Sequence, residues 1–316
     1  MDKRLRNYTF NKLEIRILRQ LAKGKHSLSD IRKNLLIGSS LLSYNLKKLF
    51  QKGIIQIIGR GPNKRIYFDS SKHASLFREL LLIYDHIKWE NLIPSLAIEI
   101  LFQASNNSEM SYRNFSKVTC WRHVRNLKAH GILESDDMMH YSINPRFSIL
   151  KELLIEYQRF LINTLVKSVS ESAVILWQKD FECLIRTPKS LVVPKKNFFR
   201  TATSRLHDFS IPILSDFDIY FYSKNKDTVQ IEDVILHTLL IDRDNVRYAL
   251  YSLLLLKKKW KRIDEEYLLR EAQKLDLGLQ VNAMFQFLRT HGRRKGLTLP
   301  SWEEFIAKAK EYEVLD

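Results

Sequence analysis

The chain has 316 residues, of which 45% are hydrophobic, and a formal net charge of +17. This length leaves room for two or three domains with substantial cores. Its two cysteines, Cys120 and Cys183, cannot form a disulfide framework or a four-ligand zinc site. The N-terminal residues lack the apolar core of a signal peptide, and the longest apolar run, 248–256, is too short to cross a bilayer. We therefore expect a cytoplasmic protein without a membrane partner.

The positive charge is concentrated at the start of the chain. Residues 1–90 hold 19 Lys and Arg against 7 Asp and Glu, which leaves 33 against 28 for the remainder. A basic domain attracts polyanions, and replacing the counterions of a nucleic-acid backbone is the commonest use of such charge. A lysine-rich solvated surface is the alternative that charge alone does not exclude.

An internal repeat gives the strongest indication of fold. Residues 46–55, Leu-Lys-Lys-Leu-Phe-Gln-Lys-Gly-Ile-Ile, are echoed by residues 124–133, Val-Arg-Asn-Leu-Lys-Ala-His-Gly-Ile-Leu. Each copy has the pattern of a basic helix that ends at Gly and is followed at once by an apolar strand. This order is typical of a winged helix-turn-helix, whose second helix enters a DNA groove while its hairpin lies along the backbone.

The first copy is predicted to contain three helices and a hairpin. Asn11 and Ser27 are typical helix caps, and Glu14 can complete a capping box with Asn11. The helices and strands are predicted, in chain order, at residues 11–22, 27–35, 39–51, 54–58 and 65–68. On the third helix the apolar positions that face inward are Leu42, Leu46 and Leu49. A connecting helix is expected at 76–89.

The second copy is predicted with the same plan and weaker signals. A helix begins near Pro94, and a short helix near 111–115 leads to a third helix at 117–130. There Cys120, Val124 and Leu127 take the positions of Leu42, Leu46 and Leu49. The hairpin strands are expected at 132–134 and 140–143.

A long amphipathic helix at 147–169 is of the kind that links modules or pairs with its copy in a dimer. Beyond it, short strands and helices alternate and the chain ends in helices. The strands are predicted at 173–177, 181–186 and 217–222, and the helices at 199–207, 231–240, 246–257, 264–274, 279–290 and 302–312. The predicted fold class is α+β, with winged helices at 1–90 and 91–146, a linker or dimerisation helix at 147–170, and a C-terminal α/β and helical domain at 171–316.

The candidate DNA-binding residues are polar or basic and lie on the third helix and hairpin of each copy. Helical geometry places the candidates of the first copy's third helix opposite its leucine stripe, and the candidates of the first hairpin lie on a Gly-rich turn. They are Ser40, Ser43, Tyr44, Lys47 and Lys48 on the first helix, Arg60, Lys64 and Arg65 on its hairpin, and Arg122 and Arg125 on the second helix. Trp121 lies directly before Arg122. Because Asp136 and Asp137 at the second hairpin tip would repel phosphates, the second copy is predicted either to contact DNA or to hold a dimer or position the first copy.

One motif points to an enzyme. Asp216 and Asp218 open the strand 217–222, and nucleotidyltransferases hold two metal ions with carboxylates placed in this way. Ser204 is similar to the serine of their Gly-Ser turn, but Thr203 replaces the glycine and no third carboxylate follows. An Asp-x-Asp pair is common by chance, so we favour a structural role. No metal, cofactor or catalytic residue is predicted, since the nine histidines form no His-x-x-x-His pair and no phosphate loop is present.

Three C-terminal segments resemble those of an archaeal family of tandem winged-helix regulators, often labelled ArsR-like. They are Thr203-Ser-Arg-Leu-His-Asp-Phe-Ser-Ile-Pro-Ile-Leu-Ser215, Ile231-Glu-Asp-Val-Ile-Leu-His-Thr-Leu-Leu240 and Leu299-Pro-Ser-Trp-Glu-Glu-Phe305. The first also resembles the C-terminal domain of abortive-infection antitoxins. The antitoxins are a family of transcription repressors, and the resemblance implies a transcriptional regulator whose C-terminal domain has a nucleotidyltransferase-like fold and no catalysis.

The sequence thus predicts a transcriptional regulator that binds double-stranded DNA as a homodimer. The C-terminal domain would serve dimerisation or the sensing of an effector or protein partner that the sequence does not name. Two alternatives stay open. One is a toxin-like nucleotidyltransferase that carries DNA-binding modules, and the other is a protein-interaction or RNA-binding role for the winged helices.

Overall fold

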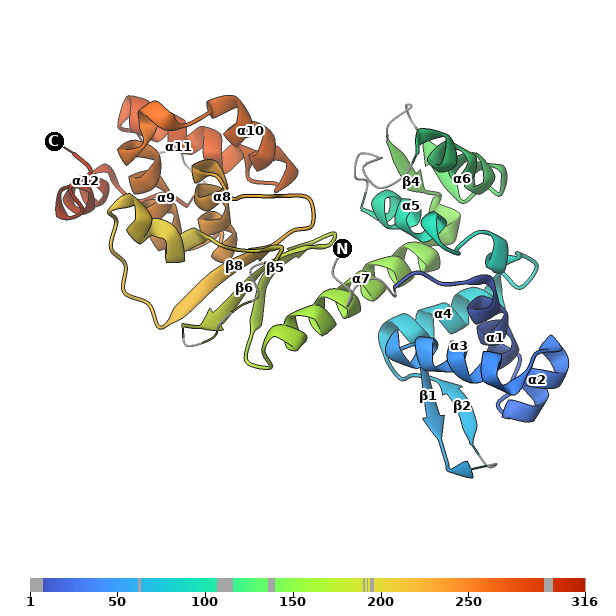
Figure 1. The fold of residues 1–316 in the computed structure, drawn as a ribbon. Coiled ribbons are helices and arrows are strands. Elements are labelled where there is room, and N and C mark those ends of the chain that lie inside the picture. Colours follow the sequence, from blue (N-terminus) through green and yellow to red (C-terminus); the bar gives the residue numbers. More distant parts are fainter. Residues whose placement is uncertain are drawn as a thin grey trace. The chain divides into compact units, whose positions relative to one another are not determined.

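The computed structural model describes residues 8–61, 64–106, 116–135, 140–189, 191, 193, 196–292 and 298–315. Helices and antiparallel sheets make up the fold, which is of the α+β class (Figure 1). The chain divides into an N-terminal unit, Met1–Leu165, and a C-terminal unit, Val166–Asp316. Among the described residues, no helix has the length and apolar character needed to span a membrane.

Three helices open the N-terminal unit as predicted: α1 (Lys12–Ala22), α2 (Leu28–Leu35) and α3 (Ser39–Gln51). Asn11 and Glu14 form the expected capping box on α1, and the Ser27 hydroxyl accepts the N–H of Asp30 at the start of α2. The apolar stripe of α3, Leu42, Leu46 and Leu49, is buried against the other helices. The spacing of leucines therefore fixes which side of α3 faces solvent.

A two-stranded antiparallel hairpin follows, formed by β1 (Ile55–Ile58) and β2 (Arg65–Phe68). Ser27, just before α2, forms a β-bridge with Arg65, and the N–H of Ile66 donates to the His26 carbonyl at 2.9 Å. The hairpin is thus tied at its base to the α1–α2 connection. Its far end extends away from the helices (Figure 1).

The connecting helix differs from the prediction of 76–89. Helix α4 (Lys72–Ile83) begins four residues earlier and ends six earlier, and a 3-10 turn η2 (Trp89–Asn91) follows. The early start follows a local turn in which Asp69 accepts the N–H of Ser71 at 2.9 Å. The early end reflects burial of Trp89, whose indole N–H donates to the Tyr84 carbonyl at 3.2 Å.

The second copy contains α5 (Leu96–Ser105), α6 (Lys117–Ala129) and a hairpin of β3 (Leu133–Ser135) and β4 (Tyr141–Ile143). The predicted short helix at 111–115 and the acidic pair Asp136 and Asp137 lie outside the described residues. The predicted inward positions are buried as expected, namely Cys120, Val124 and Leu127.

Helix α7 (Ser148–Val169) has the predicted length. Its apolar face packs inside the N-terminal unit, where the Tyr157 hydroxyl donates to the Tyr8 carbonyl at 3.0 Å and Phe160 lies 4.4 Å from the His73 ring. The prediction of a linker or dimerisation helix rested on that apolar face. This face is covered by other residues of the same chain.

The C-terminal unit contains one antiparallel sheet in the order β5-β6-β8-β7. Its strands are β5 (Val174–Lys179), β6 (Glu182–Pro188), β7 (Phe198–Arg200) and β8 (Phe217–Tyr222). The predicted helix at 199–207 is wrong at its start. The residues 198–200 pair with β8 as an edge strand, and a 3-10 helix η4 (Ala202–Phe209) follows.

Helix α8 (Ile231–Ile241) and η4 lie against the sheet, and the other C-terminal helices pack on these and on one another (Figure 1). These other helices are α9 (Val246–Lys258), the 3-10 turn η5 (Trp260–Arg262), α10 (Glu265–Lys274), α11 (Gly278–Thr290) and α12 (Trp302–Glu311). Helix α8 is buried almost all round and packs against α9, α10 and η4. Ser301 and Glu304 form the predicted capping box at the start of α12.

Candidate nucleic-acid interface

The outer face of α3 is exposed and polar. Ser40, Ser43 and Lys47 are exposed, and Tyr44 is 57% exposed. Lys48, the fifth candidate, is half-buried, and its Nζ lies 4.5 Å from the centre of the Tyr44 ring. The structure therefore brings the five predicted residues onto one helix surface, with Lys48 at its margin.

A side-chain hydrogen bond joins α3 to the N-cap of α1, and a second bond lies within α3 itself. The Asn11 side-chain amide donates to the Asn45 carbonyl oxygen at 2.8 Å, and the Asn45 amide donates to the Leu41 backbone at 2.7 Å. Asn45 is 2% exposed, so these bonds satisfy a group that would otherwise be buried without a partner. They hold the orientation of the outer face.

Lys52, the last cation of the basic helix, has a different role. Its Nζ lies 2.6 Å from Glu14 Oε1 and 4.8 Å from the centre of the Phe10 ring, and both members of the ion pair are buried. Burial lowers the pKa of Lys52, and the neighbouring Glu14 opposes that shift only in part. Lys52 therefore fastens α3 to α1 and is not a contact for an external anion.

The hairpin cations, Arg60, Lys64 and Arg65, are all exposed. Within the described residues no acidic side chain forms an ion pair with any of them or with Lys47. Among the described residues of the unit some other cations do form such pairs, as in Arg19 with Glu90 at 3.4 Å and Lys72 with Glu152 at 2.7 Å. The hairpin cations thus carry charge that the described side chains leave uncompensated.

A feature of the sequence accounts for this imbalance. Residues 31–68 contain eight Lys and Arg and no Asp or Glu. The stretch covers most of α2, all of α3 and the whole hairpin. This acid-free run, which the predictions above did not use, adds Arg32 and Lys33 on α2 as further exposed cations.

Helix α6 presents the second set of candidates. Arg122 and Arg125 are exposed, and Trp121 beside them is 60% exposed. The Arg125 guanidinium lies 5.5 Å from the centre of the Trp121 ring. Lys128 and Tyr141, which the sequence pattern did not single out, form a second cation and ring pair at 5.9 Å.

The two acidic residues of the Asp-x-Asp motif in the C-terminal unit occupy different positions. Asp216 lies ahead of β8 and is exposed, whereas Asp218 within the strand pairs with Arg200 Nε at 3.3 Å. The Ser204 hydroxyl accepts the N–H of Ile219 at 2.7 Å, so it braces η4 against β8. In the part of the chain that the structure describes, no group of three His, Cys, Asp or Glu side chains could hold a metal ion.

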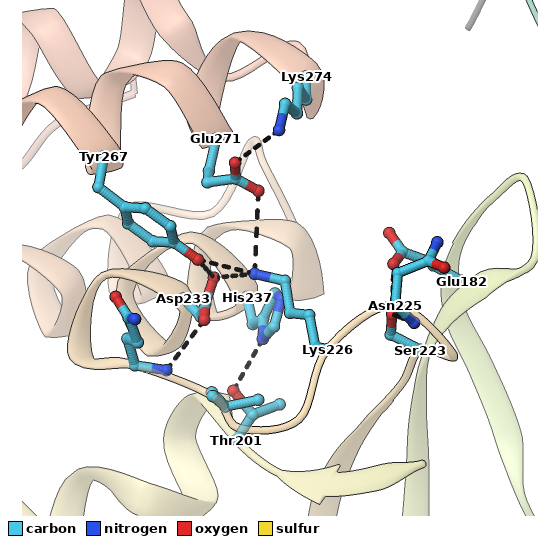
Figure 2. Close-up of polar contacts among 12 residues, drawn as sticks. Glu182, Thr201, Ser223, Asn225, Lys226, Asp233, His237, Tyr267, Glu271 and Lys274 are labelled. Atoms are coloured by element: carbon cyan, nitrogen blue, oxygen red, sulfur yellow. Dashed lines mark hydrogen bonds and ion pairs between the residues drawn. The ribbon is translucent and has the colours of Figure 1, made fainter. Parts of the chain in front are cut away.

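A polar network in the C-terminal unit was not predicted from the sequence (Figure 2). Lys226 Nζ contacts Asp233 and donates to the Tyr267 hydroxyl at 3.0 Å, while Glu271 lies 3.8 Å away. Burial by itself lowers the pKa of Lys226, but Asp233 and Tyr267 outweigh it and the pKa is raised. The network joins the loop after β8 to α8 and α10. Its residues lie too far apart in the sequence to be predicted from the spacing of a motif.

A second buried contact lies beside it in Figure 2. His237 Nδ1 lies 2.8 Å from the Thr201 hydroxyl, and its ring stacks on Phe221 at 4.1 Å between centres. Burial lowers the pKa of His237 to about 3. The ring is therefore neutral in the folded protein near pH 7 and braces α8 against the sheet.

Comparison with known proteins informs only the C-terminal unit. Residues 195–314 match a family model described as HVO_2833_C, C-terminal. No curated protein and no solved structure matches the chain. The matched segment includes β7, β8, the network around Lys226 and the helices α8 to α12.

Proposed function

We propose that this protein is a transcriptional regulator that binds duplex DNA through its N-terminal unit. In this proposal residues 8–68 form a winged helix-turn-helix in which α3 enters the major groove and the β1–β2 hairpin is the wing. The order of three helices and a hairpin supports it, as does the bridge between Ser27 and Arg65. The observation that carries it is the exposed, acid-free surface of α3 and the hairpin cations.

The roles of the two types of contact differ. Lys47, Arg60, Lys64 and Arg65 are long cations suited to phosphates, which position the protein on the duplex. Ser40, Ser43 and Tyr44 supply adaptable donors and acceptors that can meet base edges. In this proposal the hairpin gives affinity and the α3 face gives selectivity.

The remainder of the chain has supporting roles in this proposal. A second winged helix would span α5 to β4, and the C-terminal unit would be a nucleotidyltransferase-like domain without catalysis that serves dimerisation or sensing. The use of Asp218 by Arg200 and of Ser204 by the β8 backbone supports a structural role for those residues. We propose that the protein acts in the cytoplasm as a homodimer, with a surface other than the covered face of α7 joining the copies.

Selection of duplexes from a randomised pool by the intact protein tests the proposal. We expect the wild type to prefer a selected duplex over a scrambled one, and Tyr44→Ala to reduce that preference by about fivefold to a hundredfold, since a good base contact is worth roughly 1–3 kcal/mol. Leu82→Ala on α4, where Leu82 is 48% exposed, is the matched control. Failure of the wild type to bind any duplex would refute the proposal.

A further inference from the structure

The outer face of α6 carries an exposed stripe of unusual composition. Val118, Trp121, Arg122 and Arg125 follow one another at helical spacing on a single face. Val118 is 76% exposed and Trp121 is 60% exposed, and both arginines are exposed. We call these four residues the α6 stripe. Two large apolar side chains on the solvent side of a helix require a physical explanation beyond folding.

Rings and cations alternate on this surface. The Arg125 guanidinium lies over the Trp121 ring, and Lys128 lies over Tyr141 on β4 while donating to the Ser135 hydroxyl at 2.7 Å. Between the two pairs is a shallow hollow of about 380 Å³. Its lining residues are Trp121, Val124, Arg125, Lys128, Ala129 and Tyr141. The surface therefore offers two aromatic rings, each with a cation beside it.

The charge of the helix selects a class of ligand. Helix α6, Lys117–Ala129, contains four Lys and Arg and no Asp or Glu. A polyanion is thus favoured over a basic or neutral protein surface. Unpaired nucleotide strands combine phosphates with open base faces, and base stacking on an aromatic side chain contributes about 1–3 kcal/mol per base.

Alignment of the two copies of the internal repeat shows how the surface of α6 differs from that of α3. With the register of the repeat, Ser40 and Ser43 of α3 correspond to Val118 and Trp121 of α6. In a duplex the base faces stack on one another and only their edges are exposed in the grooves, which suits the hydroxyl-bearing side chains Ser40, Ser43 and Tyr44 of α3. An indole ring finds no open base face there, whereas an unpaired strand provides one.

We propose that the α6 stripe and its hollow bind an unpaired nucleic-acid strand. Trp121 stacks on a base, and Arg122, Arg125 and Lys128 contact the flanking phosphates. This goes beyond duplex binding by α3 and gives the second copy of the repeat a ligand of its own. The chemistry is shared by single-stranded DNA and RNA, so the source of the strand is decided by the experiment.

The test uses the intact protein with labelled oligothymidine, oligouridine and a duplex of equal length. We expect Trp121→Ala to weaken binding of at least one unpaired strand by about fivefold to a hundredfold, as removal of one stacked base predicts, and to leave duplex affinity unchanged. Trp121→Phe keeps a ring and should restore most of the affinity. Ser43→Ala, at the equivalent position of α3, is the control and should leave strand binding unchanged.

The outcomes separate the alternatives. Weakening confined to oligothymidine or to oligouridine supports the proposal and identifies the source of the strand. Equal weakening of duplex and unpaired strands would overturn it in favour of a second duplex contact. Absence of strand binding by the wild type, or strand binding indifferent to Trp121→Ala, would also overturn it. Absence of duplex binding by the wild type would instead count against the proposed function. The measurements with unpaired strands do not test that function.

Discussion

At the scale of single residues, burial decides which charged groups are free for function. Lys52 belongs to the same basic helix as Lys47 and Lys48, yet it is 3% exposed and paired with Glu14. The sequence does not distinguish these lysines, because the difference arises from how α3 packs on α1. Only the structure shows that Lys52 is buried in an ion pair while Lys47 remains exposed.

The Lys52–Glu14 pair gives a stability prediction. Lys52→Met removes one partner and leaves a buried carboxylate, so we expect the free energy of unfolding to fall by about 3–5 kcal/mol. Adding Glu14→Gln should recover much of that stability, because Gln keeps the capping interaction with the Asn11 N–H and carries no charge. Urea unfolding of the intact chain measures both variants. A cost under about 1 kcal/mol for the single variant would refute this role.

His237 gives a prediction about pH. Its pKa is lowered from 6.5 to about 3 in the folded protein, so between these values the unfolded chain binds a proton that the folded chain does not. Stability is therefore fully present above pH 6.5 and is lost as the pH falls toward 3. From pH 6.5 to 4.5 we expect a loss of about 2–3 kcal/mol from this group.

His237→Asn isolates that contribution, because it keeps a hydrogen-bonding group near Thr201 and removes the titration. Urea unfolding of the wild type and the variant at several pH values provides the measurement. The variant should lose less stability on acidification than the wild type. Identical pH dependence in the two proteins would contradict the assignment.

At the scale of elements, the sequence predicted helices and strands correctly where neighbouring residues alone determine them. The capping box at Asn11, the leucine spacing of α3 and the strand Phe217–Tyr222 are all observed as predicted. Prediction failed where distant contacts determine the structure. The residues 198–200 become a strand only because β8 pairs with them, and the end of α4 depends on burial of Trp89.

The internal repeat supplies a matched pair of glycines for a test at this scale. Gly53 and Gly131 occupy equivalent positions with φ of +62° and +68°. A Cβ on Gly53 would lie 2.5 Å from Phe160 Cζ of α7, whereas nothing lies within 4 Å of one on Gly131. Gly131→Ala should cost only the backbone strain of about 1–2 kcal/mol.

Gly53→Ala should cost that strain and about 1–3 kcal/mol more, because the Phe160 ring, which lies beside His73, would have to shift. Adding Phe160→Leu should reduce the excess. Thermal or urea unfolding of the three variants measures these differences. Equal costs for the two glycine variants would show that α7 does not pack on the first copy as described.

At the scale of the whole molecule, some charged side chains form internal ion pairs, whereas others are exposed and are candidates for contact with DNA. The candidate interface was predicted in large part from the sequence, since the helix face and the hairpin cations follow from periodicity and turn composition. The network around Lys226 and the pairing of Lys128 with Tyr141 could not be predicted, because each joins residues that only the tertiary fold brings together.

The salt dependence of duplex binding tests the central claim most directly. The logarithm of the association constant should fall linearly with the logarithm of salt concentration. Replacing Arg60, Lys64 and Arg65 together with Ala should reduce the slope by about 2–3, because each phosphate that is no longer neutralised lowers it by about one unit. Replacing Lys257, Lys261 and Arg262 of the C-terminal unit removes the same charge and serves as the control. A slope unchanged by the hairpin variant, or reduced equally by the control, would contradict the assignment of these cations to the DNA backbone.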